Sequence, residues 1–221
     1  MPFDAVTLTI IKTGIWESLF MVFTSSFISY MIGIPLGIIL VVTDQEGIKP
    51  FPIVQKTLGL VINLFRSIPF IILLIMVLPF TKWVVGTTLG AKAVVVPLVI
   101  AAAPYVARVV ESSLKEVDAG VIEAAKSMGA SPLQIIWKVL LPEAKPSLLM
   151  GATIAVTTIL GYSAMAGFVG GGGLGTIAIN YGYYRYEINM MLLTVIILVI
   201  IVQIIQESGM KLAKVSDKRI R

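Results

Sequence analysis

Both cysteine and histidine are absent from the 221 residues of the sequence. Without cysteine there is no disulfide bond and no thiolate nucleophile, and without either residue the common zinc sites are excluded. A Ser-His-Asp or Cys-His catalytic group is excluded for the same reason. Charged residues are also scarce, at 13% of the chain against about 25% in soluble domains. The low charge argues against a soluble domain.

Apolar residues are abundant instead, at 57% of the chain, and the mean hydropathy is +0.98. Such a chain is expected to be an integral membrane protein in contact with membrane lipid. Its length suffices for one all-α bundle of about five transmembrane helices, so we expect a polytopic membrane protein with a single domain over residues 1–221. The net charge of +5 comes from basic residues dispersed along the chain, which argues against a nucleic-acid partner.

Apolar runs predict the transmembrane helices at about residues 16–42, 53–80, 93–110, 146–168 and 188–205. In the first run, Gly33 and Gly37 flank Pro35 and predict a surface for close helix packing. In the third run, Pro97 and Pro104 predict bends. The N-terminus lacks the basic segment of a signal peptide, so the first run is expected to remain in the protein.

The distribution of lysine and arginine predicts the orientation, because cytoplasmic segments of membrane proteins carry the excess of these residues. With the N-terminus outside, the inner segments hold Lys49, Lys56, Arg108, Lys115, Lys126, Lys138, Lys145, Lys211, Lys214, Lys218, Arg219 and Arg221. The outer segments hold only Lys12, Lys82, Lys92 and Arg185. We therefore expect the N-terminus outside, and the C-terminus and the connection at about residues 118–142 in the cytoplasm.

The connection at residues 118–142 is the long amphipathic segment of the sequence, and its first half predicts a short helix. Asp118 is a suitable N-cap, and the helix is expected to end near Met128 with Gly129 in the left-handed conformation. Ala124 and Ala125 are small enough for a partner's surface to approach this helix closely.

A second short helix is expected directly after the first. Ser131 and Gln134 have the spacing of a capping box, Pro132 suits the first helical position, and Pro142 is expected to end the helix. Two capped helices are more structure than a connection between two spans requires. The segment is therefore expected to be a docking element, and the alternative is an amphipathic connection that lies on the membrane.

This segment resembles the coupling loop of permease subunits of bacterial ABC importers. The pattern of that loop is Glu-Ala-Ala, three residues, Gly, nine residues and Ile-x-Leu-Pro, and the chain has it from Glu123 to Pro142 with Val139 in place of Ile. Residues 65–70 and 161–175 resemble more narrowly the permeases of methionine importers. The resemblance covers nearly the whole chain.

The resemblance implies a permease subunit of an ATP-driven importer in the bacterial cytoplasmic (inner) membrane, with methionine as cargo. It implies that Glu123, Ala124, Ala125 and Gly129 couple the chain to the ATPase. The implied partners are a second copy of the chain, a dimer of cytoplasmic ATP-binding subunits, and an extracytoplasmic substrate-binding protein or lipoprotein. An ABC permease for another amino acid or small polar solute is the alternative.

Three residues are candidates for the transport pathway or a gate: Arg66, Ser163 and Met165. Arg66 lies near the end of the polar first half of the run at residues 53–80, which is expected to continue as one helix. Its side chain either lines a polar cavity or reaches the membrane interface. Ser163 and Met165 lie between Gly161 and Gly167, where helices pack tightly or leave a narrow lumen. The thioether of Met165 suits a gate, a contact with a thioether substrate, or core packing.

The run Gly170–Gly175 has the spacing G-x-G-x-x-G, but it follows a predicted transmembrane helix rather than a strand, which argues against a dinucleotide site. It suits either an outer gate or a tight re-entrant turn. No P-loop sequence occurs in the chain, so we expect it neither to bind ATP nor to hold a cofactor, and not to be an enzyme. Glu17 and Glu207 are expected at the membrane interface without a specific role.

Two other classes of protein fit the sequence less well. A secondary transporter or channel usually shows repeated halves and acidic residues within the membrane, whereas no acidic residue lies in the middle of a predicted span. An intramembrane enzyme needs a nucleophile, a base or a metal, and without histidine and cysteine only isolated serines and threonines remain.

Overall fold

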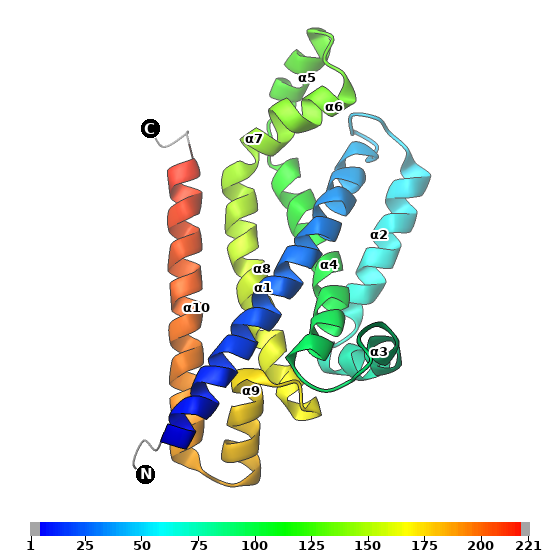
Figure 1. Ribbon diagram of the computed structural model, residues 1–221. Coiled ribbons are helices and arrows are strands. Elements are labelled where there is room, and N and C mark those ends of the chain that lie inside the picture. Colours follow the sequence, from blue (N-terminus) through cyan, green and yellow to red (C-terminus); the bar gives the residue numbers. More distant parts are fainter. Residues whose placement is uncertain (1–4, 218–221) are drawn as a thin grey trace. The chain divides into compact units, whose positions relative to one another are not determined.

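A computed structural model describes residues 5–217, and all the regular elements in this range are helical. Figure 1 follows the helices along the chain: α1 (Ala5–Val42), α2 (Pro52–Ser67), α3 (Phe70–Val85), α4 (Ala91–Lys115), α5 (Ala119–Ser127), α6 (Pro132–Ile135), α7 (Leu141–Glu143), α8 (Lys145–Met165), α9 (Gly173–Ile177) and α10 (Ile188–Ser216). A π-helical turn joins α6 to α7, a 3-10 turn follows α8, and a π-helical segment follows α9.

Four helical segments of the described chain are long and apolar enough to cross a membrane: α1, α4, Lys145–Val169 and α10. The pair α2 and α3 adds a fifth if the two are counted as one interrupted span. Because lipid offers the backbone no hydrogen-bond partner, helices that satisfy their own backbone groups are the expected solution. The prediction of an all-α polytopic membrane protein is confirmed.

The chain divides into two compact units, each assembled from separate stretches of sequence. Among the described residues, unit 1 holds 5–28, Ile68–Ala102 and Val156–Ile205, and unit 2 holds Ser29–Ser67, Ala103–Ala155 and 206–217. The helices α1, α4, α8 and α10 each contribute to both. The single domain over residues 1–221 stays a prediction.

The core of unit 2 is an apolar cluster on α4 and the segments after it. Its buried members are Val106, Val110, Leu114, Val117, Ala125, Ile135, Ile136, Leu140, Ala144 and Ala155. The helix α1 contacts α4 through glycines: a Cβ on Gly33 would lie 2.5 Å from Cγ1 of Val106, and one on Gly37 would lie 2.7 Å from the carbonyl oxygen of Ala107. No side chain fits at either position, so the predicted helix-packing surface is confirmed.

The glycine run forms a tight turn in unit 1. Gly170, Gly172 and Gly173 have φ angles of +73°, +78° and +76°. A Cβ on Gly167 would lie 2.6 Å from the carbonyl carbon of Gly175, so the turn folds back onto the preceding residues with backbone against backbone. This geometry favours the tight re-entrant turn among the two interpretations of the run.

Glu17 connects α1 to this glycine turn. Its Oε2 accepts a hydrogen bond of 2.7 Å from the N–H of Gly173, and Oγ of Ser18 accepts one of 2.9 Å from the N–H of Leu174. These amides begin α9 and have no partner within that helix. The expectation that Glu17 has no specific role is therefore wrong, because its carboxylate satisfies a backbone N–H of the turn.

Two predicted helix boundaries are wrong. The helix α1 begins at Ala5 rather than near residue 16. The second apolar run is not one helix, because α2 ends at Ser67 and α3 begins at Phe70. Pro69 between them has an extended backbone with ψ of 134°, and the ring of a proline disfavours a helical conformation in the residue before it.

The C-terminal helix is also longer than predicted. It continues to Ser216, so Lys211 and Lys214 of the predicted basic tail are helical. A Cβ on Gly209 would overlap the side chain of Thr153, which shows how closely this end of α10 packs on α8 within unit 2. The basic residues Lys218, Arg219 and Arg221 lie outside the described residues.

Replacing Gly33 by leucine is expected to lower the stability of the purified protein. The added side chain must displace Val106, and overpacking of this kind costs about 1–3 kcal/mol. Gly161→Ala is the matched control, because a Cβ there has no neighbour within 4 Å and the φ angle is not positive. Thermal unfolding in detergent measures the effect, and equal midpoints for the two variants would contradict the packing role of Gly33.

Candidate functional site

The segment 118–142, called the docking element below, begins with α5. Asp118 caps this helix, since its Oδ1 accepts a hydrogen bond of 2.7 Å from the N–H of Gly120. The helix ends where Gly129 adopts a φ of +78° and the N–H of Ala130 donates to the carbonyl of Ala125 at 3.1 Å. The predicted cap and the predicted glycine terminus are confirmed.

The second helix of the docking element begins as predicted and ends differently. Oγ of Ser131 accepts a bond of 3.4 Å from the N–H of Gln134, and Oε1 of Gln134 accepts one of 2.8 Å from the N–H of Ser131. The prediction that Pro142 ends the helix is wrong, because the helical path continues through it into α7. A π-helical turn at Ile136–Leu140 precedes Pro142, and its wider winding makes room for a ring that clashes in a regular α-helix.

One face of the docking element packs on unit 2. Ala125 is only 4% exposed, and it belongs to the same buried cluster as Leu114 and Val117 at the end of α4. Ile135 and Leu140 complete this face. The expectation that a partner's surface approaches Ala125 is wrong. Its side chain is buried inside the chain, because helical spacing puts Ala124 and Ala125 on different faces.

The opposite face exposes large apolar side chains. The exposed fraction rises from 43% for Val121 to 82% for Met128, with Leu133 and Trp137 between them. Glu123, Ala124 and Gly129 are also exposed. We call the four large side chains the apolar docking face. These four side chains are not predictable from the sequence, because the spacing of apolar residues on so short a segment does not separate exposed positions from core positions.

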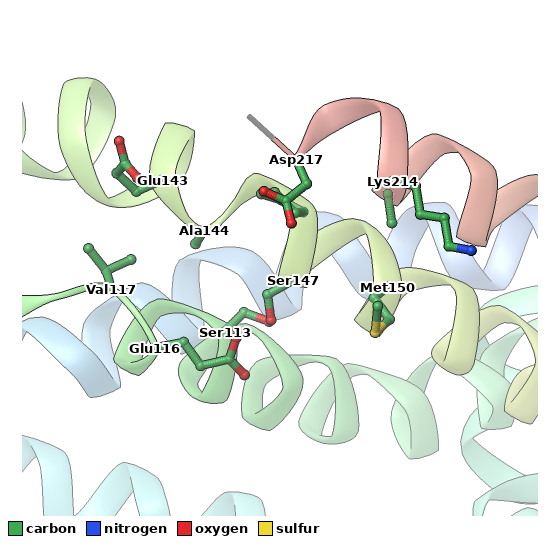
Figure 2. A pocket seen from close by; sticks show the side chains of 11 residues that line it. Ser113, Glu116, Val117, Glu143, Ala144, Ser147, Met150, Lys214 and Asp217 are labelled. Carbon is green, nitrogen blue, oxygen red and sulfur yellow. The ribbon is translucent and has the colours of Figure 1, made fainter. Parts of the chain in front are cut away.

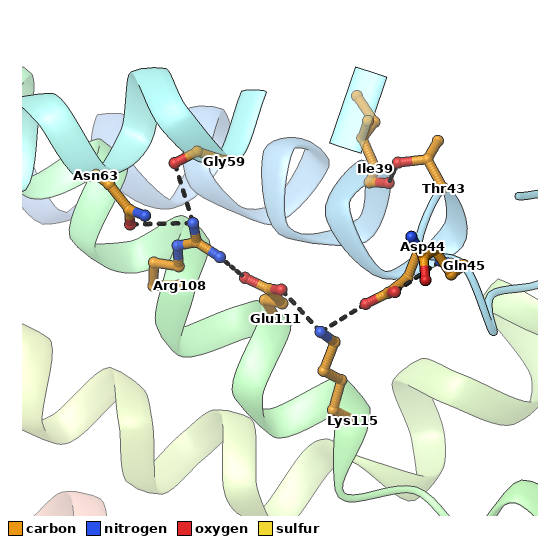
Figure 3. Close-up of polar contacts among 9 residues, drawn as sticks. All are labelled: Ile39, Thr43, Asp44, Gln45, Gly59, Asn63, Arg108, Glu111 and Lys115. Carbon is orange, nitrogen blue, oxygen red and sulfur yellow. Dashed lines mark hydrogen bonds and ion pairs between the residues drawn. The ribbon is translucent and has the colours of Figure 1, made fainter. Parts of the chain in front are cut away.

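A network of charged side chains runs along α4 from Arg108 to Lys115 (Figure 3). Nη1 of Arg108 is 2.5 Å from Oε2 of Glu111, and Nζ of Lys115 is 3.0 Å from Oε1 of the same carboxylate. Nη2 of Arg108 donates to the carbonyl of Gly59 and to Oδ1 of Asn63 on α2, both at 3.0 Å. The network therefore joins α4 to α2.

The other end of the network forms an ion pair with the loop between α1 and α2. Nζ of Lys115 lies 2.7 Å from Oδ2 of Asp44 in that loop. The hydrogen bond from Lys115 holds the pKa of the Asp44 carboxyl below its ordinary value, with a further lowering by the backbone N–H of Gln45. The role of Arg108, unlike the position of Arg66 within an apolar run, is not predictable from the sequence, because the partners of Arg108 on α2 lie far from it along the chain.

A pocket of about 410 Å³, with both apolar and charged side chains in its lining, lies in unit 2 among the ends of α4, α8 and α10 (Figure 2). Glu116, Glu143, Lys214 and Asp217 contribute charge to its lining. Oγ of Ser147 and Oγ of Ser113 form a hydrogen bond of 2.9 Å in its wall. Residues 5–217 contain no group of three or more histidine, cysteine, aspartate or glutamate side chains suited to a metal ion.

The three candidates for the pathway or gate occupy different environments. Arg66 is exposed in the last turn of α2. Ser163 is buried in α8, and its hydroxyl donates to the carbonyl of Leu160 at 2.7 Å. Met165 is exposed at the end of α8. None of them is part of the docking element or the charged network.

Replacing Gly129 by alanine is expected to loosen the docking element, because a side chain in the left-handed conformation costs about 1–2 kcal/mol. The amide of Ala130, bonded to Ala125, is then expected to exchange its hydrogen roughly 5- to 30-fold faster. Ser127→Ala, at an exposed helical position nearby, is the control. Hydrogen–deuterium exchange checks this, and an unchanged rate in Gly129→Ala would contradict it.

Asp44 is expected to make stability depend on pH in the acidic range. Its pKa is lowered on folding, so its stabilising effect is complete above the unfolded value of about 3.9 and is lost as the pH falls through the folded value. Unfolding midpoints between neutral pH and about pH 3 are expected to fall less for Asp44→Asn than for the wild type. Glu46→Gln, an exposed neighbour, is the control. Equal pH dependence in Asp44→Asn and the wild type would refute this effect.

Comparison with known proteins gives the family. Residues 33–221 match the family described as binding-protein-dependent transport system inner membrane component. The chain is 49% identical over 215 residues to the probable D-methionine transport system permease protein MetI of Vibrio cholerae serotype O1, covering 97% of this chain and 96% of that protein. It is 50% identical over 154 residues to the D-methionine transport system permease protein MetI of Escherichia coli K12, covering 70% and 71%.

Solved structures agree with this assignment. A chain of the MetNI methionine ABC transporter, determined in inward-facing conformations, aligns with a TM-score of 0.95 at 45% identity, covering 97% of this chain and 100% of that one. A chain of an amino acid ABC transporter with histidines aligns with a TM-score of 0.71 at 20% identity, which shows a shared fold alone. The present chain belongs to the family of binding-protein-dependent transport system inner membrane components.

Proposed function

We propose that this chain is the permease subunit of an ATP-driven importer and forms the pathway by which methionine crosses the membrane. Membership of the inner-membrane family of binding-protein-dependent transport systems supports the transport role. The relatives at 49% and 50% identity are named as D-methionine transport permeases, and the structural relative at 45% identity is part of a methionine ABC transporter. These names support methionine as the cargo.

The observation that carries the proposal is the apolar docking face. Val121, Met128, Leu133 and Trp137 are exposed on an element whose helices are capped and whose other face is packed on unit 2. Exposed apolar patches on a well-folded segment are typical of a surface that binds a partner. The partner that we propose is the cytoplasmic ATP-binding subunit.

The residues of the docking element then have different roles. Glu123, Ala124 and Gly129 are exposed and are proposed to contact the ATPase or to shape the contact. Ala125 is buried, so we propose that it couples indirectly, by holding α5 against the end of α4. Closure of the ATPase dimer would move the docking element, and α4 would carry that movement into the membrane.

The proposed assembly contains two copies of this chain, a dimer of cytoplasmic ATP-binding subunits and an extracytoplasmic substrate-binding protein. The excess of lysine and arginine in the loop between the first two spans, in and around the docking element and in the C-terminal tail supports a cytoplasmic C-terminus and an external N-terminus. ATP is bound and hydrolysed by the partner in this proposal, so the chain needs no cofactor and is not itself an enzyme.

Arg66 and Met165 are the proposed pathway residues, because both side chains are exposed within the single chain and so are available to a lumen formed with a second copy. The hydroxyl of Ser163 is buried and bonded within α8. Its contribution to the pathway is therefore proposed to be structural.

Uptake of labelled methionine into proteoliposomes tests the proposal. The vesicles contain this chain and its ATPase partner, with the binding protein on the side of the substrate. Ala124→Trp is expected to lower ATP-driven uptake by roughly tenfold or more, because a bulky side chain in a packed interface costs more than about 1.4 kcal/mol. Ala5→Trp is the matched control, because Ala5 is also an exposed alanine in a helix and lies far from Ala124 in the sequence.

The possible outcomes separate cargo from architecture. Uptake that requires ATP, disappears in Ala124→Trp and persists in Ala5→Trp would support both. If another amino acid enters and methionine does not, the cargo is wrong and the docking site stands. Uptake driven by an ion gradient without ATP would overturn the proposed function.

A further inference from the structure

The charged network on α4 connects α2 with the end of α4 on which the docking element packs. Glu111 is at its centre, with a side chain only 7% exposed. Arg108 contacts one of its oxygens and Lys115 contacts the other. The buried carboxylate thus has a cation on each side, which offsets the cost of removing its charge from water.

Arg108 is the link from this centre to α2. A guanidinium presents several N–H groups in a rigid plane, so it can hold partners on two helices at once. Nη1 bonds to Glu111, while Nη2 bonds to the carbonyl of Gly59 and the side chain of Asn63. A Cβ on Gly59 would lie 3.2 Å from Nη2, so a larger residue would press on the guanidinium.

Lys115 is the link toward the docking element. It is the last residue of α4 and bonds to Asp44 in the loop between α1 and α2. Leu114 and Val117 on either side of it are buried in the cluster that also contains Ala125 and Ile135 of the docking element. The docking element is thus packed on the same helical end from which the charged network extends to α2.

We propose that Arg108 and Glu111 are positioning residues that make α2 follow α4 when the docking element moves. Without them, α4 is expected to move with the docking element while α2 lags behind, and ATP hydrolysis then drives less transport. This inference rests on the proposed function, since it assumes that the docking element is moved by an ATPase. It extends that function by identifying side chains within the permease that transmit the movement.

Arg108→Lys is the variant that isolates the link to α2. A lysine ammonium still neutralises Glu111, so no unpaired carboxylate is left buried. It lacks the planar fork that reaches Glu111, Gly59 and Asn63 together. Lys56→Gln is the matched control, because it changes a basic residue on α2 that is exposed and outside the network.

The first readout is the amount of methionine imported per ATP hydrolysed by the reconstituted complex. Arg108→Lys is expected to lower this ratio about 3- to 30-fold, the range for mutations that weaken coupling between sites, while ATP hydrolysis and complex assembly persist. Lys56→Gln is expected to keep the wild-type ratio. A merely structural defect would lower assembly and ATP hydrolysis instead, so it would not reproduce this pattern.

The second readout does not depend on the cargo. Because the chain has no cysteine, spin labels can be attached at Thr57→Cys on α2 and Ser112→Cys on α4, both exposed positions. The distance distribution between them is expected to stay narrow through the ATP cycle with Arg108 present. It is expected to broaden or shift in Arg108→Lys.

The outcomes distinguish this inference from the proposed function. Unchanged label distances in Arg108→Lys, or an unchanged ratio of methionine to ATP, would overturn the positioning role. If the wild-type complex hydrolyses ATP and imports no methionine, the proposed cargo fails, and the label distances still decide the positioning role. A lowered ratio together with separated movement of α2 and α4 would establish it.

Discussion

The buried carboxylate of Glu111 is the constraint on which the arrangement of unit 2 depends. A carboxylate that is 7% exposed is tolerated only with compensating charge, and here Arg108 and Lys115 provide it from the same helix. The same two cations also bond to other segments. Arg108 donates to the backbone of α2, and Lys115 pairs with the carboxylate of Asp44. One buried charge therefore organises contacts among three segments that are distant in sequence.

The docking element packs on the end of α4 that carries Lys115 of this network. It has one buried apolar face and one exposed apolar face. Buried residues such as Ala125 and Ile135 fasten it to the core, while Met128, Leu133 and Trp137 remain exposed. The caps at Asp118 and Ser131 satisfy backbone groups that packing alone would leave unpaired. A segment that packs on the core through one face and exposes an apolar face on the other is suited to transmit the movement of an ATP-binding subunit.

Local features were predictable from the sequence and long-range contacts were not. The caps, the left-handed Gly129 and the packing glycines Gly33 and Gly37 follow from the preferences of single residues, and the structure confirms them. The continuation through Pro142 was missed because a π-helical turn is not encoded by any simple spacing. The partners of Arg108 and Glu17 were missed because each depends on residues brought close only by the fold.

Site-specific photo-cross-linking from the position of Trp137 tests whether the docking element contacts the ATP-binding subunit. Trp137 is exposed on the apolar docking face, so a photoreactive residue there reports what covers that face in the assembled complex. If the segment couples the permease to its motor, the photoreactive residue is expected to form a covalent product with the ATP-binding subunit. Cross-links to lipid alone, with none to that subunit, would show that the segment lies on the membrane and would contradict the docking role.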